Sequence, residues 1–240
     1  MKLLSKKWLA ALLFVSTNVL AMNITASSWL LADGDGKIIN GTNTSEVRSI
    51  ASISKLITVM TVLDAGQNLN QRIGNFTRRE LIELALVKSD NQAAITLCNN
   101  YPQGRSGCVN AMNEKIRGMG LTHTFLNEPT GLSIMNVSTA EELVTIVMEA
   151  QKYPAIVSAS NTLRDKIKVK KKWYNFNNTN PIVNSYTFLV SKTGYIKASG
   201  GCIVMMLDTT FGRRIVVLLN SKNTKTRIPE AEYIANLQVV

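Results

Sequence analysis

Ser52 and Lys55 are the two residues of this sequence whose types and spacing best suit chemistry. They lie three positions apart at the start of a predicted helix, so their side chains share one face. A serine hydroxyl is a poor nucleophile and needs an adjacent base, and a lysine is that base when burial and a nearby positive charge keep it neutral. The pair therefore predicts a serine acyl-transfer site in which Ser52 is the nucleophile and Lys55 the base.

The helix that carries this pair is predicted to be buried in the middle of a domain. From Ser52 to Gly66 it is apolar almost all round, and its polar residues gather in the first turns, so that end is expected to open into a cleft. The single histidine, His123, shows no sign of being the base, and one histidine argues against a multi-histidine zinc hydrolase. We therefore expect neither a metal nor a cofactor.

Two further motifs follow along the chain. Lys192-Thr193-Gly194 supplies a second positive charge on a predicted strand, with a glycine where a ligand backbone would approach closely. Ser89-Asp90-Asn91 lies between two predicted helices, where these residue types are also good helix caps. Each motif alone is weak, but Ser-x-x-Lys, Ser-Asp-Asn and Lys-Thr-Gly in this order mark penicillin-binding proteins and class A β-lactamases.

The first residues are interpreted as a targeting segment. Lysines precede an apolar run from Trp8 to Ala21, which is shorter than the ~20 residues that span a bilayer as a helix. This pattern is typical of a secretory signal peptide over residues 1–21, cut after about Ala21, and an uncleaved anchor is the alternative. We expect the mature chain, residues 22–240, to be one domain without a transmembrane segment, located in the periplasm.

The basic charge favours anionic partners without identifying one. The formal net charge is +11, and residues 1–21 hold three lysines and no acid, which leaves +8 on the mature chain. The densest basic stretch, Lys166 to Lys172, alternates with Ile167 and Val169 and predicts a half-exposed strand with its lysines outward. No nucleic-acid partner is expected, because an exported protein rarely meets nucleic acid.

The order of predicted elements indicates an α+β fold. Strands at both ends with helices between them imply one antiparallel sheet built from both termini and flanked by helices, with an inserted helical lobe at about 67–153. The turn at Asp33–Gly36 predicts a hairpin. The predicted strands are Ser28–Ala32, Lys37–Asn40, Tyr186–Ser191, Gly201–Asp208 and Arg213–Asn220.

Local signals place the helices and one disulfide. Two capping boxes are predicted, at Thr77 with Glu80 and at Ser138 with Glu141. Cys98 and Cys108 bracket a turn-like stretch and favour a disulfide, worth roughly 3 kcal/mol by loop entropy, whereas Cys202 is interpreted as a buried thiol. The predicted helices cover 52–66 and 81–87, begin at Gln92, Cys108 and Ser138, and end with a closing helix at Pro229–Leu237.

Nearly all of the mature chain resembles the low-molecular-mass penicillin-binding proteins, the D-alanyl-D-alanine carboxypeptidase and endopeptidase family. Arg48–Leu56 is similar to the nucleophile segment of the family, and Glu128–Ser133 with Asn136–Ala140 to its loop and helix start. Lys192–Tyr195 through Gly201–Met205 resembles the endopeptidase branch of the penicillin-binding protein 7 type. The resemblance implies the penicillin-binding/β-lactamase-like transpeptidase fold.

The resemblance also implies a role for each residue of the site. Ser52 attacks the D-alanyl carbonyl while Lys55 takes its proton, and Ser89 relays a proton to the leaving amine. Lys192 keeps Lys55 neutral. The implied binding residues are Asn91 for the substrate amide, Lys192 and Thr193 for the substrate carboxylate with Gly194 beside them, and the backbone N–H groups of Ser52 and Tyr195 for the oxyanion hole.

The function implied is that of a serine DD-peptidase with peptidoglycan stem peptides as substrates and β-lactams as covalent inhibitors. An endopeptidase that cuts D-alanyl cross-links is favoured, and a carboxypeptidase or a non-catalytic penicillin sensor or wall-binding protein are the alternatives. A class A β-lactamase also needs a glutamate that activates water, for which Glu128 is the nearest candidate, although its surroundings match the peptidase loop.

Two departures from this family are visible. The stretch between Gly66 and Ser89 is shorter than in the endopeptidase branch, so a hairpin at the cleft rim is expected to be missing and the substrate preference is in doubt. The chain also ends soon after the last predicted helix, without the β-domain and amphipathic tail of membrane-anchored carboxypeptidases, which favours a soluble periplasmic enzyme.

Overall fold

A five-stranded antiparallel sheet forms the base of the molecule. The computed structural model describes residues 22–238, so the predicted signal peptide lies outside the described residues. The strand order is β2-β1-β11-β10-β9, which places the first two strands beside the last three. The α+β prediction, with one sheet built from both termini, is therefore confirmed. The strands are β1 (Ser28–Asp33), β2 (Ile38–Thr42), β9 (Phe188–Ile196), β10 (Gly200–Thr209) and β11 (Gly212–Ser221).

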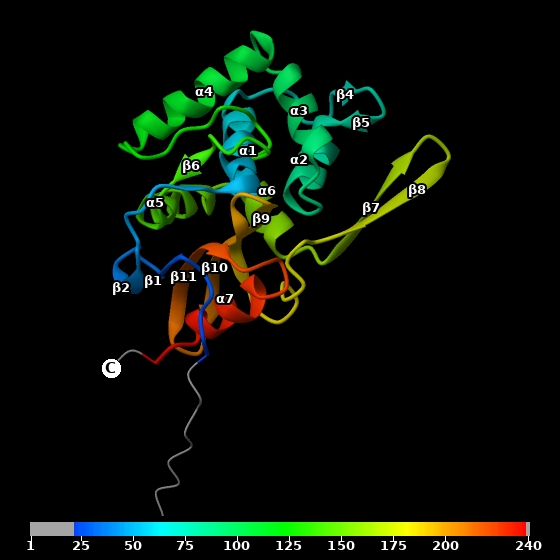
Figure 1. Ribbon diagram of the computed structural model, residues 1–240. Helices are drawn as coiled ribbons and strands as arrows, with labels where there is room; N and C mark the ends of the chain where they lie inside the picture. The colour runs from blue at the N-terminus through cyan, green and yellow to red at the C-terminus, as the bar shows by residue number, and fades with distance from the viewer. Residues whose placement is uncertain (1–21, 239–240) are drawn as a thin grey trace, which may run out of the picture.

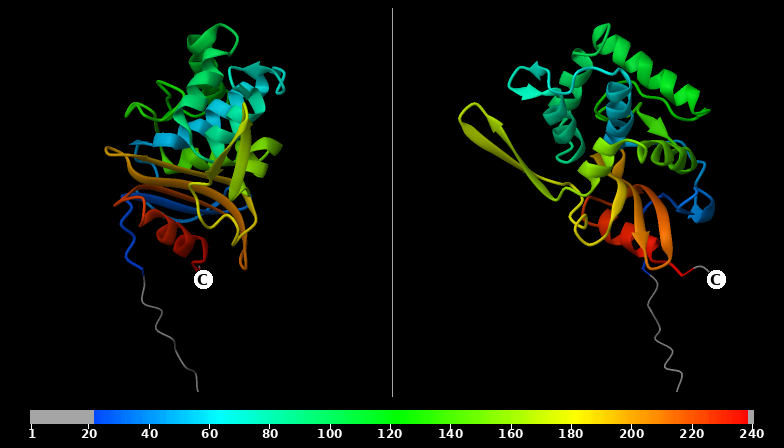
Figure 2. Two further views of the ribbon diagram at one scale, coloured as in Figure 1. Left: turned by 90° about the vertical axis from the view of Figure 1, so that its right-hand side faces the viewer. Right: turned by 180° about the vertical axis from the view of Figure 1, so that it is seen from behind.

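The two faces of this sheet bury different helices. Alternate residues of β11 point to opposite sides, as the pleat of a strand requires: Val216 and Leu218 pack with α7 (Arg227–Ala235), and Val217 and Leu219 belong to the larger core beneath the other helices. Figure 2 shows α7 on one side of the sheet and the remaining helices on the other. The closing helix thus exists, beginning two residues before its predicted start.

The remaining helices stand on the second face and surround one buried helix (Figure 1). Nine of the eleven residues of α1 are buried, as its apolar sequence predicts. Two strand pairs accompany the helices: β3 (Arg48–Ser49) with β6 (Val137–Ser138), and β4 (Arg72–Ile73) with β5 (Phe76–Thr77). The helices are η1 (Ala51–Ile53), α1 (Ser54–Asp64), α2 (Arg78–Leu86), α3 (Asn91–Asn99), α4 (Gly104–Gly118), α5 (Ala140–Ala150) and α6 (Pro154–Ser160).

One predicted capping box is confirmed and the other is wrong. Thr77 accepts from the Glu80 backbone and Glu80 bonds back, which opens α2. At α5 the cap is Thr139, whose hydroxyl accepts from the N–H of Glu142 at 3.1 Å. Ser138 is instead in β6, where its hydroxyl bonds Thr124, so the cap falls one residue later than predicted.

The lysine-rich stretch forms most of a projecting hairpin. The alternation of exposed lysines with inward Ile167 is confirmed in β7 (Arg164–Val169), but the run then turns and continues into β8 (Lys172–Asn177). The hairpin extends away from the body of the molecule (Figure 1). The single strand predicted from the lysine run is therefore the first half of a two-stranded arm.

The Cys98–Cys108 disulfide is present and ties the end of α3 to α4. Cys202 is a buried free thiol, as predicted. Between residues 22 and 238, no helix combines the length and the apolar character that crossing a membrane demands.

Candidate active site

The nucleophile candidate Ser52 lies in the middle of the short helix η1, immediately before α1. The preceding residue, Ala51, has φ of 46°, a left-handed conformation that costs energy for a residue with a side chain. Its surroundings hold it there: a Cβ atom on Gly131 would lie 1.9 Å from the Ala51 carbonyl oxygen, so only glycine fits. The loop at Gly131 therefore packs directly against the segment that presents Ser52.

Lys55 lies one turn further on and is fully buried. Its Nζ donates to Ser52 Oγ at 2.7 Å, to Asn91 Oδ1 at 2.7 Å and to the Thr130 carbonyl at 2.6 Å. Three acceptors use all three hydrogens of an ammonium group. When the amine is neutral, Asn91 and Thr130 can hold its two hydrogens, which leaves the lone pair directed at the Ser52 hydroxyl. This is the geometry that a general base needs.

The electrostatics of the site favour a neutral Lys55. Burial lowers the pKa of Lys55 to about 8, against the smaller effects of Glu128 and Asp90, whose negative charges raise it. Burial is thus the first cause of the shift. Part of the enzyme population therefore holds Lys55 as the neutral amine at neutral pH.

Ser89 and Lys192 form the second half of the site. Ser89 joins α2 to α3 in a left-handed conformation, with φ of 59°, and accepts a hydrogen bond of 2.8 Å from Lys192 Nζ. Lys192 is 1% exposed on β9. Burial, followed by the charges of Lys55 and Arg227, lowers the pKa of Lys192 well below its usual range. The positive charge of Lys55 thus disfavours the charged form of Lys192.

The strand β9 runs close beside the nucleophile. A Cβ atom on Gly194 would lie 2.9 Å from the backbone nitrogen of Ser52, so glycine permits this approach, as its place in the motif suggests. Thr193 donates to the hydroxyl of Thr179 at 2.6 Å. Arg227 of α7 donates to the Gly194 carbonyl at 2.7 Å and fixes the strand from behind. Tyr195 follows on the same strand, next to the position where the oxyanion hole is predicted.

Glu128 organises the loop that holds the Thr130 carbonyl. Its carboxylate accepts from the backbone nitrogens of Thr130 and Gly131 at 2.7 and 2.6 Å, and from that of Ser133 at 3.3 Å. Although burial alone would raise it, these hydrogen bonds bring the pKa of Glu128 below its usual range. A carboxylate used in this way supports the loop and is not free to activate water.

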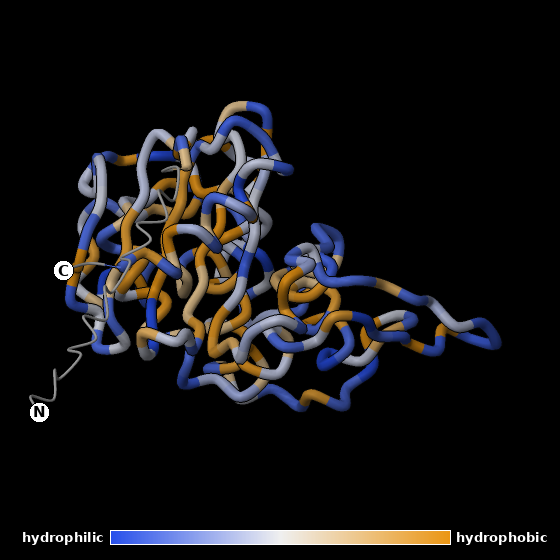
Figure 3. The backbone as a smooth tube through the Cα atoms, turned by 90° about the horizontal axis from the view of Figure 1, so that it is seen from below, coloured by the Kyte–Doolittle hydropathy of each residue, from blue (hydrophilic) through white to orange (hydrophobic). Residues whose placement is uncertain are grey.

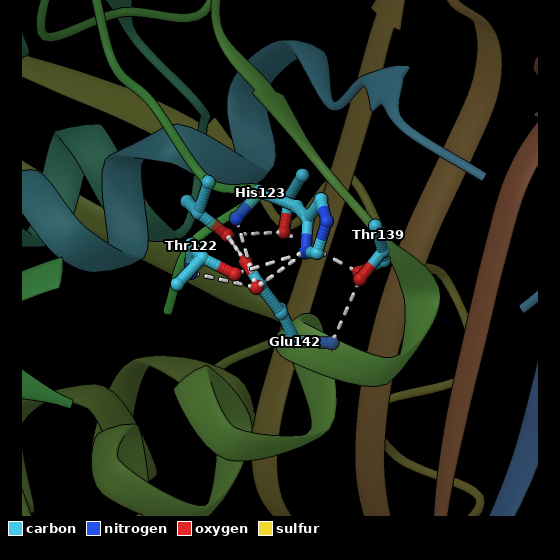
Figure 4. A network of polar contacts seen from close by, with 6 residues as sticks. Thr122, His123, Thr139 and Glu142 are labelled. Atoms are coloured by element: carbon cyan, nitrogen blue, oxygen red, sulfur yellow. Dashed lines mark hydrogen bonds and ion pairs between the residues drawn. The ribbon is translucent and has the colours of Figure 1, made fainter. Parts of the chain in front are cut away.

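His123 takes part in a different network, at the start of α5 (Figure 4). Its ring nitrogen lies 3.1 Å from a carboxylate oxygen of Glu142, which also accepts from the backbone nitrogens of Thr122 and His123. Thr139 caps the helix beside them. The network fastens a loop to a helix, in agreement with the interpretation that His123 is not the base.

The structure brings the sequence-predicted residues Lys55, Asn91 and Gly194 close to Ser52, whereas Thr193 bonds Thr179. Hydrogen bonds join Ser52, Lys55 and Asn91, and a separate bond joins Ser89 to Lys192. Sequence reasoning missed the supporting residues Thr130, Thr179 and Arg227. Thr130 acts through a backbone carbonyl that every residue type has, Thr179 lies outside the motifs, and Arg227 precedes the predicted closing helix. Asn136 was named only as part of a resembling segment, and Glu128 was named as part of the resembling loop and as the nearest candidate for a water-activating glutamate.

Asn136 ties that loop to the nucleophile helix. Its amide donates to Ser54 Oγ at 2.9 Å and to the Glu128 carbonyl at 2.8 Å. Its oxygen accepts from the backbone nitrogen of Asn127 at 2.9 Å. A single buried asparagine thus links the start of α1 to the loop that orients Lys55.

Comparison with known proteins finds relatives among the D-alanyl-D-alanine peptidases. The sequence model of the D-alanyl-D-alanine carboxypeptidase family matches residues 15–73 and 68–223. A D-alanyl-D-alanine endopeptidase of Escherichia coli is 34% identical over 207 residues, covering 76% of this chain and 67% of its own. A D-alanyl-D-alanine endopeptidase of Pseudomonas aeruginosa is 35% identical over 225 residues, covering 83% of this chain and 72% of its own.

The fold is also shared with solved structures. Penicillin-Binding Protein D2 of Listeria monocytogenes, in its cefotaxime-bound form, superposes with a TM-score of 0.78 at 20% identity and covers 89% of this chain and 97% of its own. At this identity the match shows the fold alone. The family match extends over most of the sequence, and two curated relatives are 34% and 35% identical over 67% and 72% of their own length. The chain therefore belongs to the D-alanyl-D-alanine carboxypeptidase family of serine peptidases.

Proposed function

We propose that this protein is a serine DD-peptidase that hydrolyses D-alanyl cross-links between peptidoglycan stem peptides through an acyl-enzyme on Ser52. The observation that carries the proposal is the hydrogen bond of 2.7 Å between Lys55 Nζ and Ser52 Oγ. Burial of Lys55 lowers its pKa, which favours the neutral amine that a base needs. A nucleophile within reach of a base that other groups orient is the arrangement that covalent catalysis requires.

Acylation begins when Ser52 Oγ attacks the carbonyl carbon of the D-alanyl residue. Neutral Lys55 takes the hydroxyl proton, while Asn91 and Thr130 hold its remaining hydrogens. The carbonyl oxygen gains negative charge as the tetrahedral intermediate forms. The backbone N–H groups of Ser52 and Tyr195 are assigned to it, and losing one such donor typically costs about 2.7–4 kcal/mol.

Collapse of the intermediate breaks the bond between the carbonyl carbon and the leaving nitrogen. The leaving amine needs a proton, which Ser89 donates from its hydroxyl and recovers from the ammonium group of Lys55, so that Lys55 is neutral again. Ser89 is suited to this relay because it bonds Lys192 Nζ at 2.8 Å and lies two residues from Asn91, which bonds Lys55. Lys192 and Thr193 are assigned to the carboxylate adjacent to the scissile bond, and the Asn91 amide nitrogen to a substrate carbonyl.

Deacylation reverses these proton transfers. Water attacks the ester carbonyl and gives a proton to Lys55, and the C–O bond to Ser52 breaks as the serine regains its hydrogen. The products are a free D-alanyl carboxylate and regenerated enzyme.

Endopeptidase specificity is favoured by the relatives. The proteins of Escherichia coli and Pseudomonas aeruginosa that match this chain are named D-alanyl-D-alanine endopeptidases. The name of the matching family is that of a carboxypeptidase, which keeps removal of a terminal D-alanine as the second candidate. Both reactions break a bond on the carbonyl side of the same residue type, so the site chemistry serves either.

Inhibition and location complete the proposal. The structural neighbour from Listeria monocytogenes is described with bound cefotaxime, and we propose that β-lactams acylate Ser52 of this chain. We further propose that the signal peptide predicted at residues 1–21 directs the protein to the periplasm, where peptidoglycan is located.

The test is mass spectrometry of purified cross-linked dimers and of pentapeptide monomers after incubation with residues 22–240 or with its Ser52→Ala variant. Conversion of dimers to monomers by the wild type only supports the endopeptidase. Loss of terminal D-alanine alone indicates a carboxypeptidase. No change in either substrate, together with a stable penicilloyl adduct on Ser52, would indicate a non-catalytic penicillin sensor and contradict the proposal.

A further inference from the structure

The projecting β7–β8 hairpin is the most basic segment of the described chain and has no role in the catalytic site. Six of its fourteen residues, 164–177, are lysine or arginine and one is aspartate. At its tip, Lys170, Lys171 and Lys172 are all exposed. Figure 3 shows the extended tip as predominantly hydrophilic, in contrast to the apolar strands of the sheet.

Two aromatic side chains accompany these charges. Trp173 is 56% exposed and Tyr174 is 37% exposed. Lys166 Nζ lies 4.8 Å from the centre of the Trp173 ring, and Lys88 Nζ lies 5.0 Å from that of Tyr174. Exposed aromatic rings among lysines present an extended surface with both charge and flat apolar faces.

The hairpin is connected to the catalytic segment. Lys88, which directly precedes Ser89, bonds the Tyr174 hydroxyl and also Asp90 Oδ2 at 3.1 Å. A cavity of about 390 Å³ lies between Asp90, Phe76 and Tyr174. A second cavity of about 740 Å³ shares Phe76 and Tyr174 and continues to the lysines of the tip. Two adjacent cavities that share Phe76 and Tyr174 therefore lie between the Ser89–Asn91 loop and the end of the hairpin.

We propose that this surface, Lys166 to Tyr174 with Phe76, docks a strand of the anionic peptidoglycan polymer outside the bond that is hydrolysed. The inference rests on the proposed function for the identity of the polymer. Stem peptides carry free carboxylates along the strand, which match the row of lysines in charge. The sugar rings of the glycan offer flat faces to the exposed aromatic residues.

The arrangement favours a wall polymer over a membrane surface. A protein that lies on a bilayer buries a continuous apolar face in the headgroup region. Here the tip is made of lysines, and Lys166 places a charge over the Trp173 ring. The smaller cavity is also lined by Asp90 of the Ser89–Asn91 loop, near which a strand of the substrate would be held during cleavage.

Docking on the hairpin would act on polymeric substrate and leave small substrates unaffected. The variant K170Q/K171Q/K172Q removes the three tip charges. The control K37Q/K222Q/K225Q removes three exposed lysines from other parts of the surface and causes the same change in net charge. All substitutions are at exposed positions, so both proteins should fold.

The experiment measures sedimentation of each variant with purified, insoluble peptidoglycan at increasing salt, in a Ser52→Ala background that cannot cleave it. We expect the fraction bound by the tip variant to fall roughly 3- to 100-fold, the range for loss of three exposed charge pairs, and its salt dependence to flatten. The control variant should bind as the parent does. With Ser52 restored, cleavage of a soluble dimer should be unchanged in the tip variant.

Equal binding by the tip and control variants would overturn the proposal, whether both bind fully or both weakly. A tip variant that loses binding only to anionic phospholipid vesicles, in a parallel sedimentation, would overturn it in favour of a membrane. Because binding is measured without catalysis, failure of the DD-peptidase assay leaves this result unaffected. Cleavage of the soluble dimer together with unchanged peptidoglycan binding would contradict the docking inference alone.

Discussion

The side-chain oxygen of Asn91 accepts a hydrogen bond of 2.7 Å from Nζ of Lys55, although the two residues are 36 positions apart and belong to different helices. Together with the Thr130 carbonyl at 2.6 Å, it fixes the direction of the lysine amine. The nucleophile Ser52 is the third neighbour. The base is therefore oriented by groups that do not themselves react, so its ionisation can be changed by substitutions around it.

The first prediction concerns the pH dependence of acylation. Lys55 acts as a base only when neutral, so acylation of Ser52 by a penicillin should rise with pH through about 8, the pKa of the buried lysine. Asn91→Asp places a carboxylate against the amine, which favours the charged form and should move this rise up by about one pH unit. Asp90→Asn removes a negative charge that raises the pKa of Lys55 and should move the rise to lower pH.

Stopped-flow fluorescence with a fluorescent penicillin measures both shifts. Asp35→Asn, in the exposed turn between β1 and β2, is the matched control and should leave the profile unchanged. Both site variants should fold, because aspartate suits the first turn of a helix and asparagine remains a good cap. Shifts of the same sign in the two variants, or a profile without a rise near 8, would contradict the assignment of Lys55.

The second prediction concerns Gly131, whose loop packs against the nucleophile segment. It has φ of +84°, and an added Cβ would lie 1.9 Å from the Ala51 carbonyl oxygen, a backbone atom that cannot rotate away. Gly131→Ala should therefore displace Ser52 and slow acylation by roughly 100-fold, as a misplacement of about 1 Å commonly does. The melting temperature should also fall.

Gly118→Ala is the control for this change. Gly118 is helical, and an added Cβ meets no atom within 4 Å. Replacement should leave acylation unchanged and stabilise the protein by up to about 1 kcal/mol, since alanine is the better helix former. Normal acylation by Gly131→Ala would mean that this contact does not place Ser52.

The third prediction concerns the disulfide. Cys98 and Cys108 are 10 positions apart, and the bond restricts the unfolded chain. In the loop-entropy view, replacing both by alanine should lower the free energy of unfolding by roughly 3 kcal/mol. Urea denaturation measures the loss. Reductant should destabilise the wild type and leave the double variant unchanged, and a reductant effect of equal size in both proteins would refute the role of this bond.

The catalytic motifs could be found from the sequence because their chemistry depends on residue type. A serine with a lysine three positions later can be recognised from residue types alone, so the proposed nucleophile Ser52 and base Lys55 stood out. The Thr130 carbonyl could not be found in this way, since every residue has one and only the fold directs it at Lys55. Arg227 is another such case, because its contact with Gly194 depends on how α7 packs against the sheet.

The sheet and the helices could be predicted from alternation and apolar periodicity. Their boundaries could not, because neighbouring residues were equally suited to the same position. Ser138 and Thr139 are both good caps, and pairing of Ser138 with β3 left Thr139 as the cap of α5. The lysine run had the alternation of one strand, yet the left-handed Lys170, with φ of 54°, turned it into a hairpin. This turn contains no glycine, the residue by which hairpin turns are usually recognised in a sequence.

The last prediction concerns proton uptake when substrate binds to Lys192. Burial and the charges of Lys55 and Arg227 lower the pKa of this residue, so its amine is less readily protonated in the free enzyme. A carboxylate that reaches Lys192 favours the ammonium form and raises the pKa again. Binding of a peptide ending in D-alanyl-D-alanine to the Ser52→Ala variant should therefore take up protons.

Calorimetric titrations in two buffers of different ionisation enthalpy, repeated from pH 6 to 9, measure this uptake as a buffer-dependent heat. Adding Lys192→Gln should abolish the uptake assigned to Lys192 and weaken binding roughly 10- to 150-fold, because a hydrogen bond to a charged group is lost. The same peptide with a C-terminal amide should bind weakly to both proteins. If the free acid and the amide bind equally well to the parent variant, Lys192 does not meet the carboxylate, and its contact with Ser89 must serve the proton relay alone.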